Sequence, residues 1–416
     1  MSETITGPTL GASDREAAVI ASGAEAVRIA RALVPRFAEG ASARDRERCL
    51  PREQLRELAL SGLLGVTVPR ALGGPETGAG TVAEVLRLLG TADLSLAQVT
   101  QPHFAFLNAL RLRGGDSARV RVFGDVLAGS LVSNAQAERS GRTAHTHATR
   151  LERGGDGWRI NGSKYYATGS LLADWIAVVA PAETPDGPRP HLAFVPADAP
   201  GVRVEDDWAG MGQRTTASGT VHLADVAVPD SLVLPQYLTF EAPTTYGAFA
   251  QLLHAAIDVG AARGALTEAA DFVRAKSRPW FESGVDTAAE DPLLVHRFGE
   301  LEVQVRAAEA LLASAADRVD AADAVLSEGA PGAEDATAEA SIAVAAAKVV
   351  GGRAAVEISS ALFEVAGTRA AADSENLHRH WRDTRTHTVH DPVRWKVQHV
   401  GEYSLNRRRP PRHGQI

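Results

Sequence analysis

Three stretches with different patterns of hydrophobic and polar residues follow one another along the chain. From residue 14 to 128, apolar residues recur at helical spacing among Ala, Leu, Arg and Glu, as Leu55 and Leu58 do after Pro51. A proline at the start of such a pattern is typical of the first turn of a helix. We therefore predict an N-terminal helical domain over 14–128.

The second stretch, residues 129–235, consists of short runs of strand length with turn residues between them. The clearest runs cover 175–179, 191–195 and 220–228, each bounded by Gly, Pro or Asp. The pair Asn161 and Gly162 is typical of a β-hairpin turn, because both residues tolerate positive φ. This pattern predicts a compact middle β domain over 129–235.

The third stretch, residues 236–416, returns to long helical patterns that are rich in alanine. They cover roughly 244–276, 292–326 and 335–366, and a Gly-Ala-Pro-Gly break separates the last two. Helices with so many small residues pack closely in bundles. The sequence thus predicts an α+β protein in which a β domain lies between two helical bundles.

Composition narrows the classes of function. The 416 residues, 45% of them hydrophobic, suffice for a large buried core. The net charge of −8 and the lack of a sustained basic stripe argue against nucleic acid as the main partner. A single cysteine, Cys49, allows no internal disulfide, and no uncharged run reaches the ~20 apolar residues of a bilayer span. With no signal-peptide pattern, we expect a cytoplasmic protein without a membrane partner.

The segment 382–392 carries the most distinctive candidate chemistry. It places His387, His390 and Asp391 within five positions, just before Pro392. A nearby carboxylate favours the imidazolium, so we expect Asp391 to orient His390 and hold it charged. Pro392 disfavours helical geometry at Asp391, which predicts that the pair lies where a helix ends. The alternative is a surface helix end whose cations complement the helix dipole.

Histidines are frequent in this region, which raises the alternative of a metal site. They are His378, His380, His387, His390 and His399. Their spacing matches no recognised zinc pattern, and no cysteine supports one. We expect no metal.

Three further segments carry a resemblance to a known family. They are Gly-Ser-Lys-Tyr-Tyr-Ala-Thr-Gly at 162–169, Trp-Ala-Gly-Met-Gly-Gln-Arg at 208–214 and Ala-Asp-Val-Ala-Val-Pro at 224–229. In this order and spacing they resemble the acyl-CoA dehydrogenase superfamily over nearly the whole chain. The resemblance implies an N-terminal helical bundle, a middle β-barrel domain and a C-terminal helical bundle.

The dehydrogenases of this superfamily need a carboxylate base, and both of its usual positions differ here. A Tyr-Glu-Gly-Thr segment of many members corresponds to 388–392, and the second position falls near Ala250 and Gln251, which are not acidic. The segment 387–396 instead resembles the flavin-dependent monooxygenase branch, with dibenzothiophene monooxygenases and sulfur-acquisition oxidoreductases as its nearest members. Members take reduced FMN, rather than FAD, from a separate flavin reductase and use it with O2, through a hydroperoxyflavin, to oxidise a heteroatom. A homotetramer is also implied.

The resemblance assigns a cofactor site. By it, Asn134, Tyr166, Thr168 and Trp208 line the flavin, with Thr168 also able to hydrogen-bond the bound oxygen. Asn134 and Thr168 offer hydrogen bonds, while Tyr166 and Trp208 offer aromatic faces. The alternatives are an asparagine in a turn, a threonine in a strand and core aromatic residues.

The flavin phosphate needs cations or helix-end amides. Arg278 matches an arginine that reaches this phosphate, often from a neighbouring subunit, and Arg369 follows a helix that Gly367 could cap. Either arginine could instead be solvated.

The same resemblance assigns the chemical step and the substrate. His390 with Asp391 would donate or relay the proton for oxygen–oxygen cleavage, with His387 assisting. His103 lies where the branch places substrate-facing residues, although a buried core histidine is an equal alternative. Relatives often carry a His and a Tyr where this chain has Gln98 and Pro102, so Gln98 is a candidate substrate contact.

We therefore expect a two-component monooxygenase that converts a small organosulfur compound, a thiophene or sulfide, into its sulfoxide or sulfone. Two other classes remain open: an FAD-containing acyl-CoA dehydrogenase with a relocated base, and a non-catalytic binding partner with a flavin fold. N-hydroxylation or aromatic hydroxylation on the same fold is also open, because one scaffold hosts many chemistries.

Overall fold

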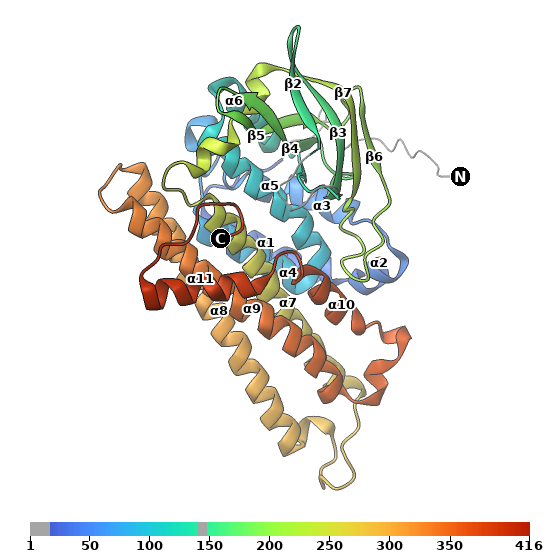
Figure 1. Ribbon diagram of the computed structural model, residues 1–416. Coiled ribbons are helices and arrows are strands. Elements are labelled where there is room, and N and C mark those ends of the chain that lie inside the picture. The colour runs from blue at the N-terminus through green and yellow to red at the C-terminus, as the bar shows by residue number, and fades with distance from the viewer. Residues whose placement is uncertain (1–16, 140–147) are drawn as a thin grey trace.

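The computed structural model describes residues 17–139 and 148–416, and its elements follow the predicted order of helices, strands and helices (Figure 1). The side chain of Ser22 caps the first helix, and that of Asp93 caps the fifth, by accepting backbone N–H bonds. Pro51 is the residue directly before the third helix. The N-terminal helices are α1 (Gly23–Ala38), α2 (Ala41–Glu47), α3 (Arg52–Leu60), α4 (Ala79–Ala92), α5 (Leu94–Arg113) and α6 (Asp116–Leu127).

The middle domain consists of two four-stranded sheets, with strand orders β1-β4-β5-β8 and β2-β3-β7-β6. Only the β1–β4 pair is parallel among the described pairs. The strands predicted at 175–179, 191–195 and 220–228 are confirmed as parts of longer strands. The strands are β1 (Val132–Ala135), β2 (Arg150–Gly154), β3 (Gly157–Ala167), β4 (Trp175–Thr184), β5 (Gly187–Pro196), β6 (Val202–Glu205), β7 (Gly219–Val228) and β8 (Val233–Leu234).

The predicted hairpin turn at Asn161 and Gly162 is wrong. The β2–β3 hairpin turns earlier, between Gly154 and Gly157, and Gly162 lies inside β3 at an irregularity of the pairing with β7. Gly162 does have a positive φ of 149°, but a Cβ there would lie 2.7 Å from the Cα of Thr149. The glycine therefore serves a bulge and a close backbone approach rather than a turn.

Long helices form the C-terminal part, within a few residues of the predicted ranges. They are α7 (Tyr246–Lys276), α8 (Pro292–Ser327) and α9 (Ala333–Ala366), followed by the shorter α10 (His378–His387) and α11 (Val393–Asn406). Helix α7 packs so closely on α4 that a Cβ added at Gly260 would lie 2.4 Å from the carbonyl oxygen of Arg87. The small residues allow this close packing, as the sequence predicted.

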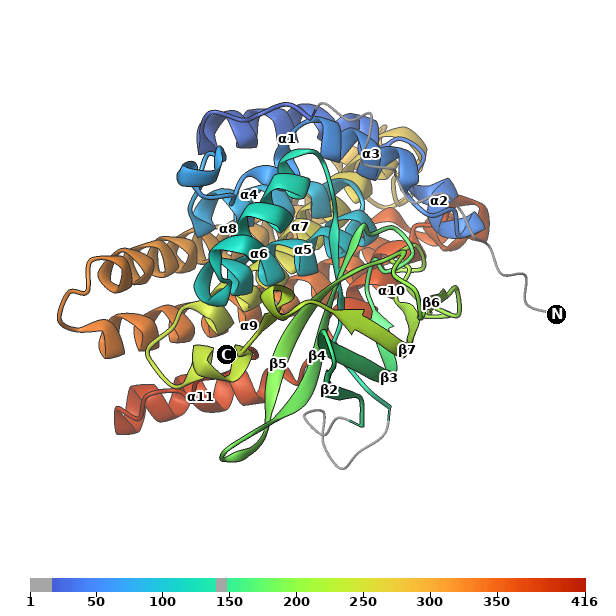
Figure 2. The ribbon, with the colours of Figure 1, turned by 90° about the horizontal axis from the view of Figure 1, so that it is seen from above.

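The N-terminal helices and the long C-terminal helices share one hydrophobic core, which joins residues of α1 and α4 to residues of α7, α8 and α9. A second core joins α5 and α6 to both sheets. Helix α5 contributes to both, with Phe104 in the first core and Leu110 in the second. Seen from above, α5 and α7 lie between the strands and the outer helices (Figure 2). This arrangement makes α5 the link between the β domain and the helical bundle.

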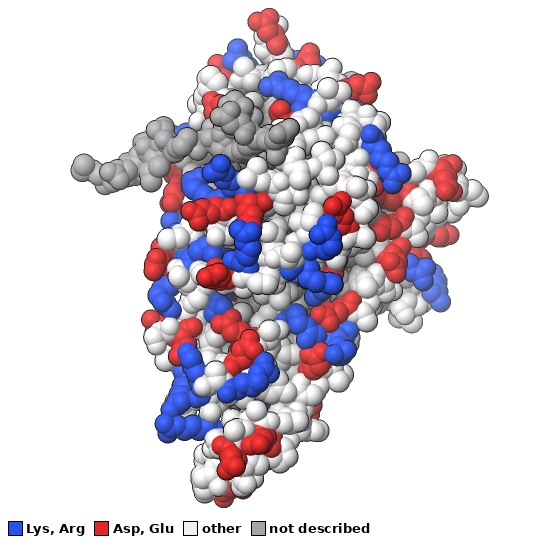
Figure 3. Space-filling view, turned by 180° about the vertical axis from the view of Figure 1, so that it is seen from behind, with Lys and Arg blue, Asp and Glu red and all other residues white. Residues whose placement is uncertain are grey.

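Charged side chains of both signs intermix over the face seen from behind (Figure 3). Charged side chains also pair across helices, as Arg263 of α7 does with Glu302 and Glu309 of α8. Among the described helices, none has the length and apolar character that crossing a bilayer requires.

Candidate active site

A hydrogen-bond network joins two residues that the sequence assigns to the flavin. The Thr168 hydroxyl lies 3.0 Å from the Ser218 hydroxyl, which lies 2.7 Å from that of Thr216. Thr216 Oγ1 and Trp208 Nε1 both donate to the carbonyl of Gln213, at 3.0 and 2.8 Å. The network fixes Thr168 and Trp208 relative to each other, so one rigid surface presents both side chains.

The backbone of this surface has left-handed residues at three non-glycine positions. They are Tyr166 (φ 54°), Gln213 (φ 48°) and Ala217 (φ 48°). Such conformations cost free energy and cluster at functional sites. At Tyr166 the strained backbone turns the ring outward, where it is 52% exposed and packs edge-on to Trp208 with a centroid distance of 6.3 Å. An exposed aromatic pair of this kind is available for a planar ligand.

Beside this surface lie three buried polar atoms without hydrogen-bond partners: Gln98 Oε1, Asn134 Oδ1 and Ser170 Oγ. Their backbones converge around Gly169, where an added Cβ would lie within 4 Å of the side chains of Val99 and Ser133. Buried polar atoms are normally satisfied, so an unsatisfied group of this kind calls for an explanation. A ligand with donors and acceptors along one edge would supply the missing partners.

A second set of polar residues lies on the helical side. The His387 Nδ1 atom is 2.6 Å from the Asp258 carboxylate, and its Nε2 atom is 3.1 Å from His254 Nδ1. The His254 ring stacks on that of His390, with centroids 4.2 Å apart and an interplanar angle of 31°. His254 and Asp258 belong to α7, and the other two histidines belong to the end of α10 and the turn after it. The predicted position of His390 at a helix end is confirmed.

The partner predicted for His390 is wrong. The Asp391 carboxylate pairs with Lys348 of α9 at 2.9 Å and with Lys396 of α11 at 2.7 Å, and all three side chains are buried. Two lysines compete successfully for the carboxylate because each brings a full charge. Loss of hydration on the ring face that stacks on His254, together with the nearby Lys348, lowers the pKa of His390 below its usual value. His390 is therefore a neutral imidazole near pH 7, although its residue is exposed at the surface of the cluster.

The predicted substrate contact His103 is also corrected. His103 is fully buried, its Nδ1 accepts the Val132 N–H at 3.1 Å, and its Nε2 lies 2.9 Å from the Leu64 carbonyl. Both ring nitrogens are used, so His103 is a core residue that joins α5 to β1. Gln98, one turn earlier on α5, keeps its unpaired oxygen and remains the candidate.

We predict that His103 makes folding stability depend on pH. Burial lowers its pKa to about 4, below the usual 6.5. His103 therefore binds a proton more tightly in the unfolded chain than in the folded protein. The neutral, buried ring makes its full contribution to folding stability above pH 6.5, and roughly 3 kcal/mol of stability is lost as the pH falls from 6.5 to 4. Urea unfolding of the wild type and His103→Gln between pH 4.5 and 7.5 should show a shallower acid loss in the variant. Equal slopes would contradict the assignment.

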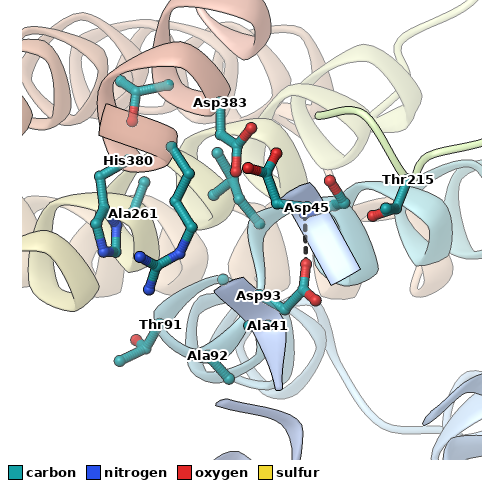
Figure 4. Close-up of a pocket in the computed structure, with 14 residues that line it drawn as sticks. Ala41, Asp45, Thr91, Ala92, Asp93, Thr215, Ala261, His380 and Asp383 are labelled. Carbon is teal, nitrogen blue, oxygen red and sulfur yellow. Dashed lines mark hydrogen bonds between the residues drawn. The ribbon is translucent and has the colours of Figure 1, made fainter. Parts of the chain in front are cut away.

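A narrow pocket lies behind the Trp208 surface, between α2, the start of α5, and α10 (Figure 4). Three carboxylates converge on it, from Asp45, Asp93 and Asp383. Asp45 is bound by Arg382, whereas Asp383 accepts the Gln213 N–H at 2.5 Å. Burial and the charge of Asp45 raise the pKa of Asp383 to about 7. Asp383 thus holds the 213–216 turn in place from the side away from Thr168.

Three family models match the chain in the order of its parts. They are the acyl-CoA dehydrogenase N-terminal domain over residues 25–130, the middle domain over 134–226 and the C-terminal domain over 252–395. The chain belongs to the acyl-CoA dehydrogenase family. The predicted fold class is confirmed with it.

Within the acyl-CoA dehydrogenase family, the chain is similar to monooxygenases. Dibenzothiophene monooxygenase of Mycolicibacterium goodii is 32% identical over 92% of this chain and 94% of the relative. A probable FMNH2-dependent monooxygenase of Pseudomonas putida, SfnC, is 32% identical over 92% and 96%. The crystal structure of FMN-bound TdsC from Paenibacillus sp. A11-2 has a TM-score of 0.86 at 31% identity, covering 94% of this chain and 100% of that one. The chain is thus an FMN-dependent monooxygenase of the family, as predicted.

Neither position of the dehydrogenase base holds an available carboxylate in this member of the family. Asp391 is bound between two lysines. Gln251 receives a hydrogen bond from Lys348 at 2.5 Å, and the neighbouring Ala250 accepts one from Gln101 at 3.3 Å. The dehydrogenase alternative therefore lacks its catalytic group at both positions.

The two phosphate candidates lie together but far from Thr168. Arg369 donates to the Lys276 carbonyl at 2.7 Å, just before Arg278, and both arginines are exposed. Gly367 caps α9 with φ 77°, as predicted. Helix α7 runs away from the β domain, so the segment after Lys276 lies at the opposite end of the molecule from β3 (Figure 1). These arginines cannot meet the Thr168 surface of their own chain.

The five clustered histidines go to separate partners. His378 pairs with Asp373, His380 with Glu268 and His387 with Asp258, while His399 packs near Trp395. In residues 17–139 and 148–416, no group of three or more His, Cys, Asp or Glu is arranged to hold a metal ion.

Proposed function

We propose that this protein is the oxygenase of a two-component system, in which a separate flavin reductase supplies reduced FMN and a small organosulfur compound becomes its sulfoxide or sulfone. Support comes from relatives named as dibenzothiophene and FMNH2-dependent monooxygenases over nearly their full length. The FMN in the TdsC structure supports FMN over FAD. The sulfur substrate is inferred from the relatives named as dibenzothiophene monooxygenases.

The residues present fit a flavin. The unpaired atoms of Gln98, Asn134 and Ser170 match the mixed donors and acceptors of an isoalloxazine edge, and Tyr166 and Trp208 offer aromatic faces. Reduced FMN would supply the electrons that activate O2. The protein's part is to orient the ring, exclude water and move protons.

The observation that most supports the proposal is the pair of neutral imidazole rings of His390 and His254. His390 and His254 stack where a dehydrogenase would need a carboxylate, and neither ring nitrogen of His390 has a hydrogen-bond partner among the described residues. A neutral imidazole can donate one proton and accept another without leaving a buried charge. We assign His390 the proton that leaves with the second oxygen atom as water. His387 assists from behind His254.

The test is product analysis. The protein, a flavin reductase, NADH, FMN and O2 are supplied with a panel of sulfides, thiophenes, amines and phenols, and products are identified by mass spectrometry. We expect oxygen atoms from ¹⁸O2 in the sulfur compounds. Oxygenated products from amines or phenols alone would contradict the proposed organosulfur substrate. Bleaching of bound flavin by an acyl-CoA without O2 would favour the dehydrogenase alternative, and no turnover in any assay a binding role.

We predict that Arg278 binds the FMN phosphate of a neighbouring copy. Arg278→Ala should weaken FMN binding by about 10- to 100-fold, the typical loss of a charge-assisted hydrogen bond. Riboflavin, which lacks the phosphate, should bind both proteins equally in fluorescence titrations. Arg274→Ala, an exposed arginine paired with Asp271 one turn earlier, is the control. An equal loss of riboflavin affinity would assign the effect to the fold instead.

A homotetramer would bring such copies together. Large apolar side chains are exposed on α8 and α11, as Leu293 (80%), Val303 (67%) and Trp395 (55%) show. Apolar surface of this kind is typical of an interface between subunits. Light scattering at micromolar concentration checks the mass, and a monomer would remove the proposed role of Arg278.

A further inference from the structure

The histidine cluster continues past His254 to a pocket between the C-terminal helices. Asp258, the last member, is one of the residues that line a pocket of about 710 Å³ between α7, α8, α9 and the start of α11. Gly352 lines the same pocket, and a Cβ there would lie 3.4 Å from Asp258 Oδ2. Gly352 therefore places no side chain between the buried Asp258 carboxylate and the pocket.

For an ionised Asp258 and neutral imidazole rings, the contacts set the direction of each hydrogen bond. The Asp258 carboxylate can only accept, so His387 donates with Nδ1–H and its Nε2 is an acceptor. His254 must then donate with Nδ1–H, at 3.1 Å, which leaves its Nε2 as a free acceptor beside the His390 ring. Three groups are thus connected in one line, and each is at most 3% exposed.

From this geometry we propose that Asp258, His387 and His254 form a proton relay between the pocket of the C-terminal helices and the His390 side of the active site. The proposal rests on the proposed oxygenase function. Asp258 and His387 act as positioning and relay residues behind His254, and none of the assigned roles above includes Asp258.

Proton movement along the line is balanced. When His254 Nε2 takes a proton from the site, its Nδ1 proton moves to His387 Nε2, the Nδ1 proton of His387 moves to Asp258, and water in the pocket accepts the proton from Asp258. Inward delivery starts from the loaded line, in which Asp258 carries the proton, His387 donates with Nε2–H to His254 Nδ1, and His254 Nε2–H faces the site. Moving each proton one position inward gives one proton to the site and restores the arrangement above. Both rings then turn over before Asp258 takes up the next proton from water in the pocket. Turnover from the singly anionic reduced flavin needs one proton: reduced flavin anion, O2, sulfide and H⁺ give oxidised flavin, sulfoxide and water.

The charges around His254 disfavour its protonated form. Lys348 from α9, Lys396 from α11, and Asp391 and His390 from the turn surround His254, and the two lysines outweigh the single carboxylate. Burial and these cations lower the pKa of His254 well below its usual value. A proton therefore passes through His254 without residing there. Arg353 and Arg385 line the pocket itself.

The first test uses the protein without flavin. Solid-state nitrogen-15 spectra of histidine-labelled wild type should show one imidazole with a strongly hydrogen-bonded Nδ1–H, assigned to His387 by its loss in His387→Gln. Asp258→Asn should weaken that signal, and Asp258→Glu should keep it. A spectrum that Asp258→Asn leaves unchanged would overturn the relay, whatever the protein catalyses.

The second test is kinetic. Asp258→Asn should lower kcat for oxygenation about 10- to 100-fold, raise the solvent deuterium isotope effect, and leave the substrate KM and FMN affinity unchanged, with partial recovery in Asp258→Glu. Asp271→Asn, an exposed carboxylate on the same helix, is the control. A normal kcat in Asp258→Asn refutes the relay, whereas an inactive wild type refutes the proposed function instead.

A variant at Gly352, which makes no hydrogen bond of the relay, tests the pocket without removing a relay residue. Gly352→Leu should fill the pocket beside Asp258, whose Oδ2 lies 3.4 Å from the added Cβ, while keeping both hydrogen bonds of His387. It should slow kcat several-fold with the same rise in isotope effect. Added imidazole, a diffusible proton carrier, should not restore it if the pocket is blocked but should partly restore Asp258→Asn. An unaffected kcat in Gly352→Leu would exclude the pocket as the proton entrance.

Discussion

Replacing His390 by alanine should lower the rate of product formation by at least about 100-fold while the protein still binds FMN. General acid–base groups contribute about 10²- to 10⁴-fold, and His390 is the exposed, unpaired member of the imidazole pair. Its loss leaves His254 and its partners in place, because those are bound to each other and not to His390. The fold should be unchanged.

Oxygen consumption separates this outcome from a loss of flavin. In His390→Ala we expect O2 uptake to continue with hydrogen peroxide as the product, because reduced FMN still reacts when proton delivery fails. Product yield, peroxide yield and FMN affinity are measured on one preparation. His296→Ala, a histidine on α8 whose side chain is 76% exposed, is the matched control. Product formation at the wild-type rate in His390→Ala would remove its assigned role.

Asp391→Asn should destabilise the protein by about 3–5 kcal/mol, the usual cost of breaking a buried ion pair by removing one partner. The change leaves Lys348 and Lys396 buried with no opposing carboxylate between them. In a chain of 416 residues the thermal midpoint should fall by roughly 3–6 °C. Because pairing holds the pKa of Asp391 below its usual range, this stabilisation exists above the ordinary carboxyl pKa and is lost as the pH falls below it.

A second substitution tests the cause. Removing one of the lysines in Asp391→Asn/Lys348→Met should recover part of the loss, since only one unpaired charge then remains buried. The control is Asp373→Asn, whose side chain is 95% exposed in a pair with His378. A surface pair contributes little, so this change should shift the midpoint by no more than about 1 °C. A similar small change in Asp391→Asn would show that the buried lysines find other partners.

The sequence predicted the features that depend on local pattern. Helix-spaced alanines placed α7, α8 and α9 within a few residues, and the Tyr-Ala-Thr and Trp-x-Gly-Met segments predicted two residues, Thr168 and Trp208, that one hydrogen-bond network joins. The hairpin at Asn161 failed because a positive φ at glycine serves a bulge as well as a turn.

Long-range partners could not be predicted. Asp391 was assigned to the neighbour beside it, but the fold brings Lys348 from another helix, 43 positions away, with a full charge. His254 and Asp258 were missed, although their spacing of four residues places them on one face of a predicted helix. That spacing was the available signal. Nothing in the sequence pairs either residue with His387.

The core that α1 and α4 share with α7, α8 and α9 governs how the chain can reach its native state during synthesis. The opening helices leave the ribosome about two hundred residues before the partners that cover their apolar faces, while the strands between them can pair locally as they emerge. Until translation passes α9, those faces need a chaperone or collapse on themselves. Truncated products that stop after the strands should accumulate as aggregates rather than as a smaller folded unit.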